Sequence, residues 1–189
     1  MEKSMMNRKE FLKLACRLGM ISGAIALAGG PGKLSAQTET TEKAAKAVEM
    51  KKKFKEFWVT NLMENMDSNL GEDLRIKLME ECGRDCARSS AIKQAEKYKG
   101  VFDGFLSYQK QFLGEENVTR KDNTVTLVLH RCYCPLVADG PEKLSDTYCY
   151  CSRGWIKEMF GTVTGKECGV KIIETVKRGG KTCSFEVAV

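Results

Sequence analysis

The chain has 189 residues, a formal net charge of +6 and nine cysteines. This length suits one domain with a sizeable core plus a short leader. Residues 1–36 hold six basic and two acidic residues, so the rest of the chain carries a net charge of only +2. A nearly balanced domain lacks the basic surface that nucleic-acid binding requires, and we therefore expect no nucleic-acid partner.

Residues 1–36 have the three parts of a removable export signal: a basic start, a short apolar middle over residues 20–30 and small residues before Gln37. The apolar run is too short to span a bilayer, which takes about 20 apolar residues, so no membrane span remains after cleavage. The sequence therefore predicts an exported protein of the periplasm or cell envelope, with the export machinery as a partner.

The basic start resembles the signal of the bacterial twin-arginine pathway, with lysine in the second twin position. The residues that carry this signal recognition are Arg8, Lys9, Phe11 and Leu12. The resemblance implies export of an already folded protein. General secretion, which exports an unfolded chain, is the alternative.

We expect a linker over residues 37–46 and a single cysteine-rich domain over residues 47–189. The domain begins with a helix that ends near Asn69, and its apolar residues recur at helical spacing, which predicts a core-facing stripe. That predicted stripe consists of Val48, Phe54, Phe57, Trp58, Leu62 and Met66. Further helices are expected over 72–88, 91–99 and 101–113.

In the second half of the chain the sequence pattern changes from helical periodicity to a mixture of strands and a helix. Residues 124–130 are β-branched and aliphatic and predict a strand, and a Pro- and Gly-containing loop follows. A helix is expected over 152–162, then an antiparallel hairpin of 169–175 with 182–189. Helices followed by a small sheet indicate an α+β fold, with the N-terminal helices packed on an antiparallel sheet.

Eight cysteines follow the leader, and six of them form three close pairs. Cys82 and Cys86 are four residues apart on a predicted helix, so both thiols project from one side, where they suit a shared metal better than a disulfide. In an extended segment, residues two apart share a face. The Cys132/Cys134 and Cys149/Cys151 pairs are then also two-pronged thiolate donors.

These six thiols make a soft metal site the leading hypothesis, since four thiolates suit a tetrahedral zinc ion and iron–sulfur clusters also take four. His130 shares the parity of Cys132 and Cys134 and is a possible additional ligand. An even cysteine number in an exported protein equally suits structural disulfides. Reactive thiols are a third alternative, because Arg84 and Arg88 flank the helical pair and guanidinium groups lower a thiol pKa.

The last third of the chain resembles a known family. The segments that carry the resemblance are residues 149–155, 170–174 and 179–187. They are similar to the closing unit of the 4-vinyl-reductase type of small-molecule-binding domain, and to proteins described as L-2-amino-thiazoline-4-carboxylic acid hydrolase-like. The string from Cys82 to Ala87 also resembles a bacterial family of exported proteins that share this ending.

The resemblance implies a 4-vinyl-reductase-like α+β fold, a small-molecule ligand between helices and sheet, and a zinc ion held partly by cysteines. Carried over by position, it makes Cys183 and one of Cys149 and Cys151 metal-binding residues. Ile172 and Thr175 stand where the remaining ligands of that family would fall, so its metal site is not reproduced whole.

Three functions follow as hypotheses. The first is an exported, metal-binding domain that takes a small-molecule ligand. The second is a hydrolase of thiazoline or cyclic amide-like substrates, using a thiolate or metal-bound water, although no catalytic residues follow from the resemblance. The third is a structural protein stapled by disulfides.

Overall fold

The computed structural model describes residues 33–138, 140 and 143–189, with side chains from Lys43 onward. Most of the predicted signal, including Arg8, Lys9, Phe11 and Leu12, lies outside the described residues. Residues 45–189 form one compact unit. None of the helices in the described part is both long enough and apolar enough to cross a bilayer.

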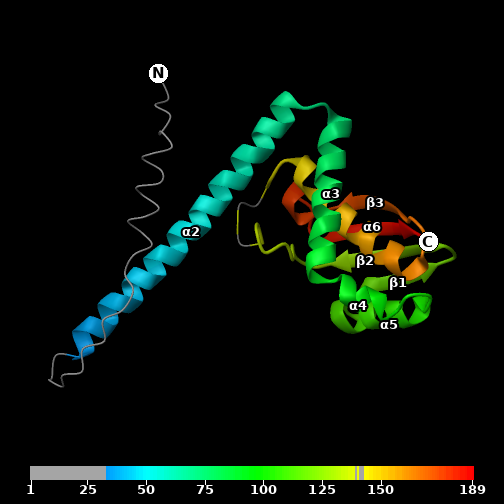
Figure 1. Ribbon diagram of the computed structural model, residues 1–189, viewed down its shortest axis with the longest axis horizontal. Coiled ribbons are helices and arrows are strands. Elements are labelled where there is room, and N and C mark those ends of the chain that lie inside the picture. Colours follow the sequence, from blue (N-terminus) through cyan, green and yellow to red (C-terminus); the bar gives the residue numbers. More distant parts are fainter. Residues whose placement is uncertain (1–32, 139, 141–142) are drawn as a thin grey trace. The chain divides into compact units, whose positions relative to one another are not determined.

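The described chain contains five α-helices and a four-stranded antiparallel sheet, which confirms the predicted α+β class (Figure 1). The helices are α2 (Lys33–Asn69), α3 (Glu72–Ser90), α4 (Ile92–Glu96), α5 (Phe102–Leu113) and α6 (Tyr150–Thr164). The strands are β1 (Val118–Lys121), β2 (Thr124–Leu129), β3 (Gly169–Glu174) and β4 (Cys183–Ala188), in the spatial order β1-β2-β4-β3. Helix α2 already includes residues 37–46, where the sequence predicts a linker.

The sheet is apolar on one face, as alternation along its strands requires. Val125 and Leu127 of β2 lie opposite Val187 and Phe185 of β4, and all four are buried. Thr126 and Glu186, the pair between them, are only partly buried on the other face. Helix α6 covers the apolar face with Ile156, Met159, Phe160 and Val163, and these residues form one continuous main core with the strands.

Helices α3 and α6 approach each other backbone to backbone. Gly83 and Gly154 make this possible: a Cβ atom at Gly83 would lie 1.9 Å from the carbonyl oxygen of Cys151, and one at Gly154 would lie 2.0 Å from that of Glu80. No other residue type fits such a separation. The contact fixes the N-terminal turn of α6 beside the middle of α3, where Cys82 and Cys86 lie.

Ion pairs border this helix contact. The Glu80 carboxylate of α3 accepts hydrogen bonds from Arg153 and from Lys157 (2.9 Å), both on α6. Burial raises the pKa of Glu80, but the hydrogen bonds from Lys157 and Arg153 outweigh it and hold the pKa below the ordinary 4.5. The Glu80 carboxylate therefore stabilises the folded state in its charged form.

We expect Glu80→Gln to reduce the free energy of unfolding at pH 7 by about 2 kcal/mol, because hydrogen bonds to charged groups are worth about 1.5–3 kcal/mol. Since the folded-state pKa is lowered, this contribution is complete above pH 4.5 and is lost as pH falls through the folded value. Urea unfolding of both proteins across this range checks the prediction. A difference that is constant down to the most acid pH would contradict it.

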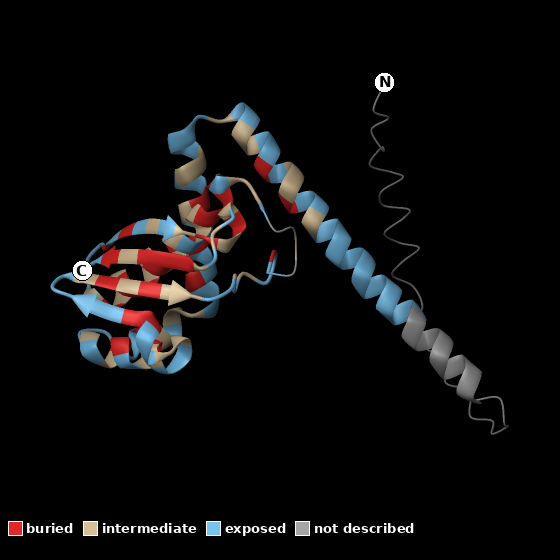
Figure 2. Cartoon of the chain, turned by 180° about the vertical axis from the view of Figure 1, so that it is seen from behind, coloured by how far each residue is buried: buried red, intermediate tan, exposed pale blue. Residues whose placement is uncertain are grey.

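One prediction about α2 is wrong. Of its expected core stripe, Val48, Phe54, Phe57, Trp58 and Leu62 are exposed, and only Met66 packs inward. Figure 2 shows much of α2 in the colour of exposed residues. The helix instead buries Val59 and Met63, which join a small second core with Met79, Val137 and Tyr148.

Candidate functional site: a cluster of thiols beside the second core

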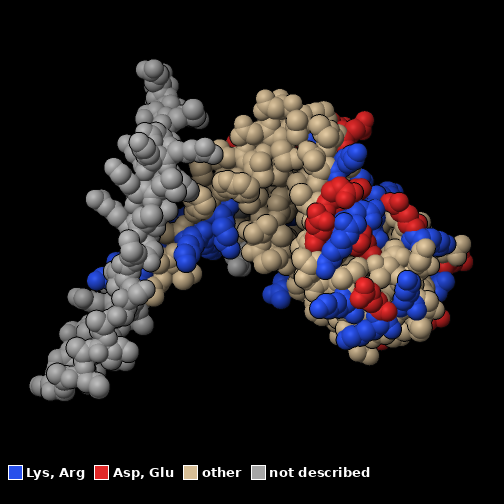
Figure 3. All heavy atoms as spheres, in the orientation of Figure 1, with Lys and Arg blue, Asp and Glu red and all other residues tan. Residues whose placement is uncertain are grey.

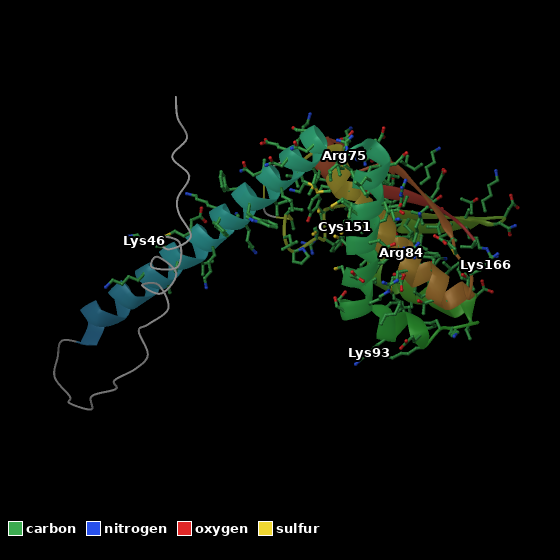
Figure 4. The ribbon with its side chains drawn as sticks, turned by 45° about the horizontal axis from the view of Figure 1, so that its top comes forward. Lys46, Arg75, Arg84, Lys93, Cys151 and Lys166 are labelled. Carbon is green, nitrogen blue, oxygen red and sulfur yellow. The ribbon has the colours of Figure 1, made fainter. Side chains whose placement is uncertain are left out.

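The N-terminal turn of α6 is the meeting point of the cysteines. The second core is bordered by Cys132, Cys134 and Cys151, which pack against its five buried residues. Figure 4 shows sulfur atoms grouped beside the labelled Cys151. The pKa of the Cys151 thiol is raised to about 12, chiefly by burial. The neighbouring thiols Cys134, Cys86, Cys82 and Cys149 add to this rise. Cys151 therefore lies within electrostatic range of all three predicted pairs.

The cysteines fall into two groups around this point. The outer thiol group, which we define as Cys82, Cys86, Cys134 and Cys151, comes from α3, the loop after β2, and α6. Cys82 and Cys86 are exposed, one turn apart, whereas Cys134 and Cys151 are partly buried. The inner thiol group consists of Cys132, Cys149 and Cys183. Burial raises the pKa of Cys149 and Cys183, and the neighbouring Cys132 adds a smaller rise in both.

Cys149 and Cys151 do not share a face, so their predicted action as one two-pronged donor is wrong. Cys149 ends the 3₁₀-helix Asp146–Cys149 and Cys151 belongs to the first turn of α6, so residues two apart point about 200° apart. Ser145 starts this helical run by accepting a hydrogen bond from the Thr147 N–H (3.1 Å). Cys149 therefore belongs to the inner thiol group, and Cys151 belongs to the outer thiol group.

Cys132 and Cys134 lie in the loop beyond the end of β2 at Leu129, where the strand alternation has stopped. The carbonyl of Cys134 accepts hydrogen bonds from Val137 and Ala138, which closes a tight turn. His130 is exposed at the start of this loop, and no described contact joins it to a thiol. Its role as an additional ligand remains a prediction.

Three residues that were not predicted as thiol neighbours contact the thiols or act on them electrostatically. The Tyr148 hydroxyl lies 3.0 Å from the Cys134 sulfur, and the Thr175 hydroxyl donates to the Cys149 sulfur at 3.0 Å. Lys177 is buried, and its charge opposes the rise that burial imposes on the pKa of Cys132. Tyr148 adjoins the Cys149-Tyr150-Cys151 string, which is the one signal that marks it in the sequence.

Arg84 and Arg88 are engaged elsewhere. Both guanidinium groups bind the Glu158 carboxylate on α6, Arg84 at 3.1 Å and Arg88 at 2.8 Å, and Arg84 also binds Glu167. Meanwhile, burial raises the pKa of Cys132, Cys149, Cys151 and Cys183. Protonated thiols are poor nucleophiles, so this environment disfavours a reactive role for these four cysteines. A reactive role for Cys82 or Cys86, the pair that Arg84 and Arg88 flank, stays a prediction.

Cys168 stands apart from both groups. It is fully buried in the main core, where its sulfur lies 3.4 Å from the Thr164 hydroxyl. Cysteine often fills such positions as a small apolar residue. All eight cysteines in the described part of the chain are free thiols. Within that part, no three His, Cys, Asp or Glu side chains already converge tightly enough to hold a metal ion.

Two solvent-open cavities lie away from the thiols, and polar residues predominate in both. One, of about 430 Å³, borders α6 and includes Arg84, Lys157 and Glu158; the other, of about 480 Å³, lies between α5 and β1. The space between α6 and the sheet, where the resemblance implies a ligand, holds main-core residues such as Phe160 and Phe185.

A family model described as "Family of unknown function (DUF6144)" matches residues 33–189. No curated protein matches the chain. The match begins at residue 33, next to the predicted end of the leader, and includes every cysteine of both thiol groups.

Proposed function

We propose that this chain, which belongs to the DUF6144 family, is a metal-binding protein whose outer thiol group takes one soft divalent ion, zinc by preference. The observation that carries the proposal is the packing around the start of α6: Cys151 and Cys134 both border the second core, and the Cys151 backbone lies directly against α3 at Gly83, between Cys82 and Cys86. Four thiolates are the donor set that structural zinc prefers.

The electrostatics of the group favour a bound cation. Four neighbouring thiols resist losing their protons together, because each thiolate raises the pKa of the others, as at Cys151. A divalent ion reverses this balance, since a coordinated thiol is deprotonated outright. The donors fit the ion chemically, and side-chain rotation of the exposed Cys82 and Cys86 is the adjustment that would gather them.

The small size of the second core gives such an ion a structural role. Among the described residues, the second core where the end of α2, α3 and the loop after β2 meet contains five buried side chains, supported at its edge by the Asp67 carboxylate of α2, which binds Arg75 and Thr147. A bound ion would cross-link α3, that loop and α6 directly, and its binding energy would then add to the folding energy. We therefore propose a structural ion before a catalytic one.

Export completes the proposal. We propose that residues 1–36 direct the folded protein to the periplasm or cell envelope through the twin-arginine pathway, so that the thiols meet their ion in the reducing cytoplasm. The order α6, β3, β4 also follows the closing unit of the 4-vinyl-reductase type of domain. We leave a small-molecule ligand as a prediction of that resemblance, because the described cavities lie elsewhere.

One preparation tests the proposal: protein recovered from the cell envelope and analysed for mass, metal and thiols. We expect a mass that matches residues 37–189, about one zinc per chain, and eight free thiols under denaturing, non-reducing conditions. Disulfides in place of free thiols would instead support the stapled structural protein. A metal-free preparation that also fails to bind added zinc would end the proposal.

Zinc titration of the metal-free protein gives an independent readout. Because the thiols of the outer group must lose protons to bind, we expect proton release on binding and an affinity that rises about tenfold per pH unit for each proton displaced. Calorimetry in buffers of different ionisation enthalpy counts those protons. Binding without proton release would assign the ion to carboxylates and not to the thiols.

A further inference from the structure

Helix α2 has two apolar sides, and only one of them packs against the fold. Val59 and Met63 are buried in the second core, and Met66 packs beside them. The other side, which we call the open face, leaves between 39% and 66% of each side chain exposed. Its residues are Met50, Phe54, Phe57, Trp58 and Leu62. Single exposed apolar residues are ordinary, but five on one helix form a patch that marks an interaction site.

The open face is continuous. At 3.6 residues per turn its five side chains fall within an arc of about 140°. Val59, Met63 and Met66 lie on a separate arc. Glu56, on the same half of the helix as these three, lies beside Gly140 in the loop after β2, where its Cγ atom would be 3.3 Å from a Cβ added at Gly140. The contact with the fold and the open face therefore use different sides of the helix.

The part of α2 that carries the open face is rich in lysine. Residues 46–62 contain five lysines and two glutamates, a net charge of +3, whereas the whole domain after the leader carries only +2. The lysines are Lys46, Lys51, Lys52, Lys53 and Lys55. Figure 3 shows Lys and Arg side chains gathered along this part of α2. Lys51 falls inside the apolar arc, and Lys53 and Lys55 lie at its two margins.

We propose that the open face of α2 binds the surface of an anionic membrane, with Phe54, Phe57 and Trp58 entering the headgroup region and the lysines contacting lipid phosphates. A basic helix with aromatic residues on its apolar side is the arrangement that interfacial helices use. Lysine at the margin of the face suits lipid, because its long stem reaches along apolar surface while the ammonium group stays in water.

A second copy of the chain is the less suitable occupant. Symmetric pairing of two open faces would bury Lys51 of each copy in an apolar contact, where an unpaired charge is costly. Anionic lipid headgroups instead complement the net charge of +3. The proposal concerns a site separate from the thiols, so it stands or falls independently of metal binding.

The fluorescence of Trp58 can report directly whether the open face enters a membrane. In full-length Trp155→Phe protein Trp58 is the single remaining tryptophan, because the chain has two. We expect vesicles containing phosphatidylglycerol, but not pure phosphatidylcholine, to shift Trp58 emission to shorter wavelength, and brominated acyl chains to quench it. Converting Lys51, Lys53 and Lys55 to Glu should weaken binding on the order of 100-fold at low salt, since each surface lysine contributes about fivefold.

Matched variants separate this surface from general effects. Lys93→Glu on α4, Lys97→Glu just after α4 and Lys121→Glu on β1 make the same change of charge, and should leave Trp58 quenching nearly unchanged. Phe54→Ser with Phe57→Ser should abolish quenching, whereas Phe112→Ser, at an exposed phenylalanine of α5, should not. All variants carry the same leader, so its contribution to vesicle binding cancels.

Two results would overturn the proposal. One is Trp58 quenching that is equal in anionic and neutral vesicles or survives reversal of the three α2 lysines. The other is a dimer, seen by sedimentation without lipid, in which Trp58 is shielded from aqueous quenchers; that result would assign the open face to a second copy.

Discussion

Replacing Gly83 by alanine is expected to destabilise the protein by about 3 kcal/mol or more, the upper range for overpacking. The new methyl group would lie 1.9 Å from the Cys151 carbonyl oxygen and 2.9 Å from the Trp155 amide nitrogen, and both are backbone atoms that cannot rotate away. Helices α3 and α6 would have to separate, which would also open the ion pairs of Glu80 and Arg84. Urea unfolding followed by circular dichroism measures the loss.

The sign of this effect distinguishes packing from helix propensity. Alanine favours an isolated helix by about 1 kcal/mol over glycine, so propensity alone predicts stabilisation. Gly71→Ala is the matched control, because it precedes the same helix and a Cβ there meets no atom within 4 Å. We expect it to change stability by less than about 1 kcal/mol. Equal effects of the two substitutions would mean that the close helix contact is not required.

Periodicity predicts the main core well and fails where one helix has two apolar sides. The residues of α6 recur with a single helical period, and the hairpin of β3 and β4 has clear turn glycines, so both are confirmed. In α2 the larger residues, Phe54, Phe57 and Trp58, form the more conspicuous stripe, yet the smaller Val59 and Met63 are buried. A periodic pattern shows that a face is apolar but not what it contacts.

The sequence predicts which cysteines belong to the candidate site, but not how they are arranged in space. Pairing in the sequence identifies the cysteines, whereas their division into two groups depends on the helical start of α6, which turns Cys149 and Cys151 apart. Strand β1 was missed because its four residues contain a single buried position, too few for alternation to show. Thr175 reaches the Cys149 thiol through tertiary packing, which no local pattern encodes.

Replacing Cys151 by serine is expected to weaken zinc binding more than about 100-fold, so that the purified protein contains almost no metal. Substitution of residues that merely orient a metal ligand costs 10- to 100-fold, and loss of a ligand costs more. Cys151 is the strongest test because it is the thiol that approaches both Cys134 and the exposed pair on α3. Serine keeps the shape of the side chain and removes only the soft donor atom.

Cys168→Ala supplies the matched control, because this thiol lies in the main core and belongs to neither group. It should retain one zinc per chain, even though loss of a buried sulfur lowers stability. Competition with a chromogenic chelator measures affinity in each variant, and thermal unfolding shows that each is folded when measured. If the Cys151 variant keeps full affinity while Cys132→Ser loses it, the ion belongs to the inner thiol group, where the Thr175 hydroxyl donates to the Cys149 sulfur.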